Sequence, residues 1–166
     1  MRVLFGCIVS ALLLAGCAAA PPPPYTMTTP FRDADFGAYS GIGRGSVHGQ
    51  AFLKTEGGDV KTCAGNPVKL VPATAYNEEK IQHAFGATLA QGAPDEAKKY
   101  TKLSICDAEG KFTFEGVPKG TWYILAMVTW KAPSSDGLLP QGGPLVQKVE
   151  VNAGIVQAIL TDADFK

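Results

Sequence analysis

Few residues in this sequence could support catalysis. It contains two histidines, His48 and His83, which are side chains able to change charge near neutral pH. A histidine acting as a base needs a nucleophile within hydrogen-bonding reach, and Ser46 and Ser104 are the candidates. Nothing in the spacing of these residues brings them together, either as base and nucleophile or as ligands of a metal ion. We therefore expect no enzymatic activity, no cofactor and no metal.

The N-terminus has the pattern of an export signal. Arg2 supplies a positive charge, and the apolar run from Val3 to Ala15 contains Ser10 as its one polar residue. A transmembrane helix needs about 20 apolar residues to cross a hydrocarbon core of about 30 Å, so this run is too short for a permanent span. The pattern predicts a signal peptide.

The end of this run, Leu14-Ala15-Gly16-Cys17, resembles the bacterial lipobox. In lipoproteins the cysteine is acylated and the bond before it is cut, which implies a signal peptide at residues 1–16 and a membrane anchor at Cys17. The resemblance implies three acyl chains, and two anchoring signals already attach a protein stably. Ala18 stands where retention in the inner membrane usually requires Asp, which implies the outer membrane, facing the periplasm. The alternative is a plain secretory signal with a chance cysteine.

Two further cysteines are expected to form a disulfide. Cys7 leaves with the signal peptide and Cys17 is acylated, so Cys63 and Cys106 remain in a compartment that oxidises such pairs. Their bridge would close a loop of about 43 residues and contribute on the order of 4 kcal/mol. Metal binding is the alternative, but neither cysteine belongs to a Cys-x-x-Cys motif or has a neighbouring histidine.

The charge balance argues against a nucleic-acid partner. Fifteen basic and fifteen acidic residues cancel, and no cluster of Lys or Arg could neutralise several phosphates. After cleavage about 150 residues remain, which suits one domain with a core of ordinary size.

A tether is expected between the anchor and this domain, over residues 17–42. Pro21 to Pro24 favour an extended polyproline conformation, which would hold the domain away from the membrane. Phe31, Phe36 and Tyr39 offer an alternative, a short segment that docks on the domain. The sequence does not decide between the two, and we assign the stretch to the tether.

Short β-branched or alternating runs separated by Gly, Pro, Asn and Asp follow, which predicts strands and turns. Glu109-Gly110 and Asn152-Ala153-Gly154 are suited to tight hairpin connections. Seven strands are expected, at Ser46–Lys54, Pro67–Val71, Thr101–Asp107, Lys111–Glu115, Thr121–Lys131, Leu145–Val151 and Ile155–Thr161. Strands that follow one another closely favour an antiparallel β-sandwich.

Three segments resemble carboxypeptidase regulatory-like domains, a family of transthyretin-like sandwiches. They are Gly45–Ala51, Asn66–Leu70 and Asp107–Trp122, the last similar to a Gly-x-Phe-x-Phe, Pro-x-Gly-x-Tyr pattern with Trp122 in place of Tyr. The resemblance implies an all-β, seven-stranded antiparallel Greek-key β-sandwich over residues 43–166. It implies an architecture without catalytic residues and leaves the ligand open.

A helical insertion is expected at about residues 73–100, where the sequence departs from this family. Asn77 is suited to capping a helix, and Ile81, Phe85 and Leu89 share one face of it. The strand Thr121–Lys131 is apolar on both faces, and a sandwich buries only one face of each sheet. We predict that the helix covers Tyr123, Leu125 and Met127; the alternative is that a partner binds this face.

Two functions remain. The first is a structural or protein-interaction module of the cell envelope, anchored to the membrane by lipid. The second is a glycan or peptidoglycan binder that uses an exposed aromatic side chain. Trp130 is the candidate for that role, with Asp136 and Gln141 supplying polar groups if the loop from Ala132 to Pro144 folds back. Trp122 is expected in the core.

Overall fold

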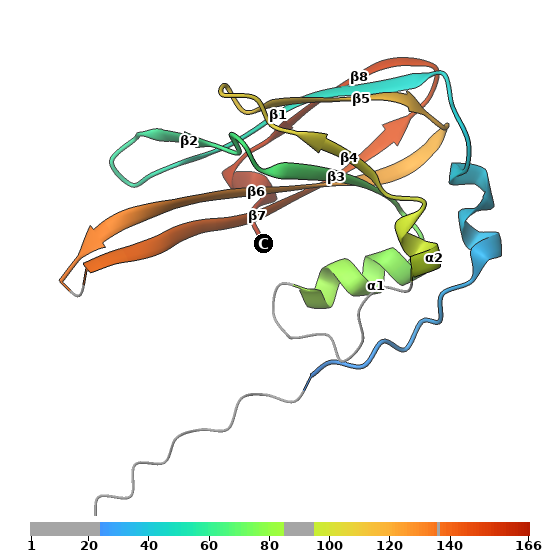
Figure 1. Cartoon of the computed structure of the whole chain (residues 1–166), viewed down its shortest axis with the longest axis horizontal. Coiled ribbons are helices and arrows are strands. Elements are labelled where there is room, and N and C mark those ends of the chain that lie inside the picture. Colours follow the sequence, from blue (N-terminus) through green and yellow to red (C-terminus); the bar gives the residue numbers. More distant parts are fainter. Residues whose placement is uncertain (1–23, 85–94, 136) are drawn as a thin grey trace, which may run out of the picture.

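The computed structural model describes residues 24–84, 95–135 and 137–166 (Figure 1). They form an all-β sandwich of two four-stranded sheets, as predicted, with eight strands in place of seven. The first sheet consists of β1 (Gly45–Lys54), β2 (Val60–Thr62), β5 (Lys111–Val117) and β8 (Gly154–Leu160). The second has the order β4-β3-β6-β7, with β3 at Pro67–Pro72, β4 at Lys102–Ile105, β6 at Gly120–Ser134 and β7 at Gly137–Val151.

Strand β1 organises the first sheet. It pairs antiparallel with β5 from Gly45 to Gln50 and with β2 from Phe52 to Lys54. It pairs with β8 in parallel, so one strand pair of the sandwich is not antiparallel. Strand β2 is the one that the sequence does not predict, because three residues are too few to show an alternating pattern.

Strand β7 is longer than expected. It pairs with β6 along its whole length, up to Ser134 opposite Gly137, so the predicted loop from Ala132 to Pro144 is instead a regular hairpin. Figure 1 shows this hairpin reaching beyond the sandwich. Pro140 and Pro144 are tolerated because β7 is an edge strand, where a residue without a backbone N–H need not break a ladder.

The core between the sheets follows the predicted alternation. Phe112 and Phe114 of β5 are both buried, and Trp122 of β6 is fully buried, as expected. The indole Nε1 of Trp122 donates a hydrogen bond to the carbonyl oxygen of Pro118 at 3.1 Å, so this polar atom is satisfied inside the core. A tight turn is present at Glu109-Gly110, where Gly110 has φ of 78°. The predicted hairpins are wrong, because β4 and β5 belong to different sheets, as do β7 and β8 on either side of Asn152-Ala153-Gly154.

Two helices form the insertion, α1 (Ala75–Ala84) and the single turn α2 (Asp95–Lys98). The predicted cap is wrong: the Thr74 hydroxyl accepts a hydrogen bond from the backbone N–H of Asn77 at 3.3 Å, so Thr74 caps α1. Asn77 lies inside the helix, and its side-chain amide donates to the carbonyl oxygen of Pro72 at 2.9 Å. Helix α1 begins at Ala75, three residues before the start that a cap at Asn77 would give.

Helix α1 covers part of the outer face of the second sheet, as predicted. Ile81 packs against a small buried cluster that includes Tyr123, and Leu125 packs against the same cluster. Met127 lies farther along β6 and is 39% exposed, so α1 does not bury it. Phe85 and Leu89, which were expected to continue the apolar stripe, lie outside the described residues.

The segment that the sequence assigns to the tether packs on the domain from Tyr25 onward. It contains a short 3₁₀ helix, η1 (Asp33–Tyr39), whose Phe36 is fully buried between Phe31, Tyr76 and Tyr100. The docking alternative therefore describes this stretch. A second 3₁₀ helix, η2 (Asp162–Asp164), follows β8.

Candidate functional site

The predicted glycan surface is partly assembled. Trp130 and Gln141 lie directly opposite each other on β6 and β7, which places both side chains on the same face of the hairpin. Trp130 is half-buried, because one side of its ring packs on the core and on Gly142. Asp136 lies outside the described residues. The sequence identifies the pair, but it does not predict the strand register that brings the two residues together.

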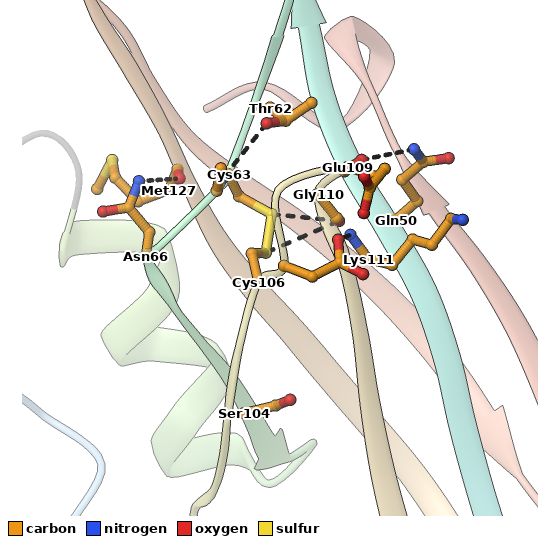
Figure 2. The surroundings of a disulfide bond; sticks show 12 residues. Gln50, Thr62, Cys63, Asn66, Ser104, Cys106, Glu109, Gly110, Lys111 and Met127 are labelled. Atoms are coloured by element: carbon orange, nitrogen blue, oxygen red, sulfur yellow. Dashed lines mark hydrogen bonds between the residues drawn. A yellow bond between two sulfur atoms is a disulfide. The ribbon is translucent and has the colours of Figure 1, made fainter.

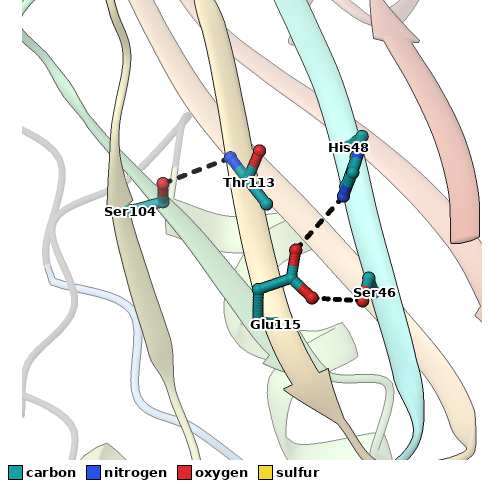
Figure 3. Close-up of polar contacts among 5 residues, drawn as sticks. All are labelled: Ser46, His48, Ser104, Thr113 and Glu115. Atoms are coloured by element: carbon teal, nitrogen blue, oxygen red, sulfur yellow. Dashed lines mark hydrogen bonds and ion pairs between the residues drawn. The ribbon is translucent and has the colours of Figure 1, made fainter.

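A polar cluster on the outer face of the first sheet joins two residues that were considered for catalysis (Figure 3). The Ser46 hydroxyl donates a hydrogen bond to Glu115, and the Nε2 atom of His48 lies 3.2 Å from the other carboxylate oxygen of Glu115. These contacts, with the Ser46 bond the larger cause, lower the pKa of Glu115. The sequence does not reveal this cluster, because Glu115 comes from a strand 67 positions beyond His48.

The order of groups in this cluster differs from that of a nucleophilic site. A catalytic base must contact its nucleophile directly, whereas here Glu115 stands between Ser46 and His48 and holds both. Ser104 lies across β5 from Ser46 and His48, and its hydroxyl accepts a hydrogen bond from the backbone N–H of Thr113 at 3.4 Å (Figure 3). His83 stacks on Tyr25, with ring centroids 3.6 Å apart. The arrangement therefore stabilises strand pairing and does not prepare a serine for attack.

The predicted disulfide between Cys63 and Cys106 is confirmed, with Cα atoms 5.7 Å apart (Figure 2). Both residues are buried. The bridge ties the end of β2 to the segment that follows β4. The carbonyl oxygen of Gly110 lies 3.3 Å from Sγ of Cys63. This is a packing contact, because a bridged sulfur carries no proton to donate.

A groove lies on the outer face of the second sheet, bordered by α1 and α2. Its volume is about 700 Å³, and its floor is apolar. Three lysines from different elements line it, namely Lys69 of β3, Lys80 of α1 and Lys98 of α2. The sequence offers no cue to this group, because the lysines are 11 or more positions apart and only the fold gathers them.

Within residues 24–84, 95–135 and 137–166, no three His, Cys, Asp or Glu side chains are grouped so that they could hold a metal ion. In the same stretches, no helix combines the length and the apolar character needed to cross a bilayer. Cys17 lies outside these stretches.

Known proteins resemble this chain in fold more than in sequence. No protein-family model and no curated protein matches it. The crystal structure of a Pseudomonas aeruginosa protein, described as a candidate carbohydrate-binding protein, superposes with a TM-score of 0.67 at 25% identity. The match covers 79% of this chain and 97% of that one. The chain therefore has a carbohydrate-binding-like β-sandwich.

A second solved structure is less similar. The major pilin subunit of Bacillus cereus gives a TM-score of 0.40 at 13% identity over 75% of this chain. The match covers 30% of the pilin subunit.

Proposed function

We propose that this protein is a non-catalytic lipoprotein of the cell envelope, held at the periplasmic face of the outer membrane by Cys17, whose sandwich binds another envelope component. The observation that carries the binding role is the similarity to the Pseudomonas aeruginosa protein along nearly all of that chain. The buried Cys63–Cys106 disulfide supports an oxidising compartment. The residues before Cys17 support export and acylation.

The docked N-terminal segment fixes how far the domain can stand from its anchor. If residues 17–42 were all tether, they would span roughly 80 Å as a polyproline helix. Because docking begins at Tyr25, only about seven residues separate Cys17 from the folded part, and even a fully extended chain reaches no more than roughly 25 Å. We infer a domain that works close to the bilayer surface.

Lipid attachment is tested in the producing cell by metabolic labelling with an alkyne-bearing palmitate. The wild-type chain takes up label, fractionates with outer membranes and begins at residue 17 by mass spectrometry. Cys17→Ser takes up no label, whereas Cys7→Ser, which lies inside the expected signal peptide, leaves labelling intact. A labelled Cys17→Ser variant, or a mature chain that begins elsewhere, contradicts the proposal.

The kind of partner is tested by isolating the protein with its neighbours from native envelopes. A protein-interaction module retains its partners after the peptidoglycan is digested with muramidase. Loss of all partners after digestion contradicts that role and favours attachment to the glycan itself.

Glycan binding is the second candidate, and the placement of Trp130 opposite Gln141 favours it. A half-exposed indole beside an amide can stack on a sugar ring and bond to its hydroxyls. Trp130→Ala then abolishes sedimentation with purified peptidoglycan. Thr129→Ala is the matched control, because this exposed neighbour points to the opposite face of β6. Equal binding by Trp130→Ala and the wild type excludes this surface.

A further inference from the structure

The groove under the helical insertion has an apolar floor that water reaches. Val71 of β3 and Leu125 and Met127 of β6 contribute the floor, and Leu103 of β4 forms its edge. Leu103 is 67% exposed and Met127 is 39% exposed. A contiguous apolar surface that stays open on a small domain commonly marks a place where a ligand or partner binds. The volume of about 700 Å³ lies within the usual range for small-molecule sites.

Positive charge gathers at the same groove. The pKa of Lys80 is lowered, chiefly because the side chain is buried and to a smaller degree because Lys69 and Lys98 repel its charge. Among the described residues, neither Lys69 nor Lys80 forms an ion pair with a carboxylate. Like charges held together in this way repel one another, and a bound anion would relieve that repulsion. This excess of positive charge is local to the groove, because the chain as a whole has equal numbers of acidic and basic residues.

We propose that this groove binds a small amphiphile with a phosphate head group, its apolar body lying on Leu125 and Met127 and its head group held by Lys69 and Lys80. A phosphate monoester carries about −1.5 to −2 charges and three acceptor oxygens, so it can bond to the ammonium groups of both Lys69 and Lys80 better than a carboxylate does. The apolar floor excludes inorganic phosphate as the complete ligand. The inference rests on the groove alone and stands whether or not the hairpin binds a glycan or Cys17 carries lipid.

The lining also argues against a sugar at this place. A sugar ring needs aromatic platforms and hydrogen-bonding side chains along its length. The groove is lined by aliphatic residues, Met127 and two prolines, Pro67 and Pro144, with Asn77 and Thr101 as its uncharged polar side chains. A neutral sugar would also bring no counter-charge to Lys69 and Lys80.

The test uses photocrosslinking of the full chain in its native membranes. The probe is an octyl phosphate that carries a diazirine near the end of its alkyl chain, and mass spectrometry maps the labelled peptides. Label is expected on the peptides that contain Leu103 and Met127. Unlabelled octyl phosphate competes at least about tenfold better than octanol, octanoate or inorganic phosphate, because each lacks a phosphate head or an apolar body.

Variants test the head-group contacts. The double variant Lys69→Gln with Lys80→Gln lowers labelling at those peptides by at least about tenfold. Lys119→Gln, which removes one charge from the exposed turn between β5 and β6, leaves labelling unchanged. Lys69→Gln alone is informative if the double variant misfolds, because Lys69 is an exposed strand residue.

Several results would overturn the proposal. If octanol competes as well as octyl phosphate, the ligand needs no charged head group. If octanoate competes equally, the head group need not be a phosphate. If inorganic phosphate competes equally, the ligand needs no apolar body. Label that maps away from the groove, or an equal loss in Lys119→Gln, also contradicts it. Acylation is measured on the same membranes with labelled palmitate, so a failure of the lipoprotein assignment is seen separately.

Discussion

The carboxylate of Glu79 on α1 accepts a hydrogen bond from the Tyr25 hydroxyl at 2.8 Å, across 54 positions of the chain. The same carboxylate accepts bonds from the backbone N–H of Thr28 at 2.6 Å and of Thr29 at 2.7 Å. One side chain thus fastens the N-terminal segment to the helical insertion. These bonds, the Thr28 backbone bond foremost, hold the pKa of Glu79 far below its usual value.

Replacing this carboxylate should release the segment without unfolding the sandwich. We expect Glu79→Gln to increase amide hydrogen exchange over residues 25–31, because an amide oxygen without negative charge accepts these bonds more weakly. Exchange in β1 and β6 should stay as in the wild type. Glu56→Gln removes the same charge from the exposed connection between β1 and β2 and serves as the control. Unchanged protection at residues 25–31 would show that the aromatic contacts alone hold the segment.

The pH dependence of docking follows from the depressed pKa of Glu79. A carboxyl whose pKa is lower when docked than when released adds stability above its ordinary value of 4.5, and loses it as the pH falls toward the docked value. The difference in protection between wild type and Glu79→Gln should therefore be constant from about pH 7 to 5.5 and shrink below about pH 4.5. The pKa of Asp33 is also lowered, chiefly by its bond with Lys99. Asp33 is present in both proteins, so its contribution to the difference in protection cancels. A difference that grows in acid would contradict this assignment.

Removing the disulfide should destabilise the whole sandwich. The bridge spans 43 positions, and in the chain-entropy model its loss costs about 4 kcal/mol of unfolding free energy. The double variant Cys63→Ala with Cys106→Ala should show this loss in chemical denaturation. Reduction of the wild type should lower its midpoint to a similar degree and leave the double variant unaffected. A double variant as stable as the oxidised wild type would mean that the bridge is dispensable.

The sequence predicts what depends on local periodicity. Alternation identifies β5 through Phe112 and Phe114, and the two apolar faces of β6 correctly indicate that its outer face is covered near Tyr123. Thr74 and Asn77 are both good capping residues, and the sequence alone does not show that α1 begins at Ala75, directly after Thr74. The first half of β7 is rich in Gly and Pro, which usually indicates a loop, and pairing with β6 overrides that preference.

Contacts between distant segments leave no local pattern. Nothing near Glu79 in the sequence indicates Tyr25, and nothing near Lys80 indicates Lys69 or Lys98. The same holds for the joining of Ser46 and His48 by Glu115. Such groups are created by the arrangement of the sheets, so the candidate binding surfaces become visible only in the fold.

Phe36 should control the docked segment separately from the main core. It is fully buried in a cluster with Tyr76 and Tyr100 that is distinct from the cluster between the sheets. Truncating a buried phenylalanine costs about 3 to 5 kcal/mol in packing. We expect Phe36→Ala to expose residues 25–36 to hydrogen exchange, while the denaturation midpoint of the sandwich changes little. Tyr39 should stay in place, because it packs on Trp122 of the main core. Phe36→Leu, which keeps most of the volume, should retain protection; a large fall in the sandwich midpoint would show that the two clusters unfold together.

Gly142 should determine how Trp130 is presented on the hairpin. This glycine has φ of 82°, and a Cβ atom there would lie 2.2 Å from the backbone carbonyl oxygen of Val128 and 2.7 Å from the Trp130 ring. Gly142→Ala should therefore strain the backbone and push the indole outward. Because Trp122 is fully buried and stays shielded, iodide quenching of tryptophan fluorescence should increase through Trp130 alone. Gly137→Ala also places a side chain at positive φ, 113°, but meets no atom within 4 Å, so it controls for backbone strain. If Gly142→Ala and Gly137→Ala give equal quenching, the ring does not rest on Gly142, and the half-buried placement of Trp130 must have another cause.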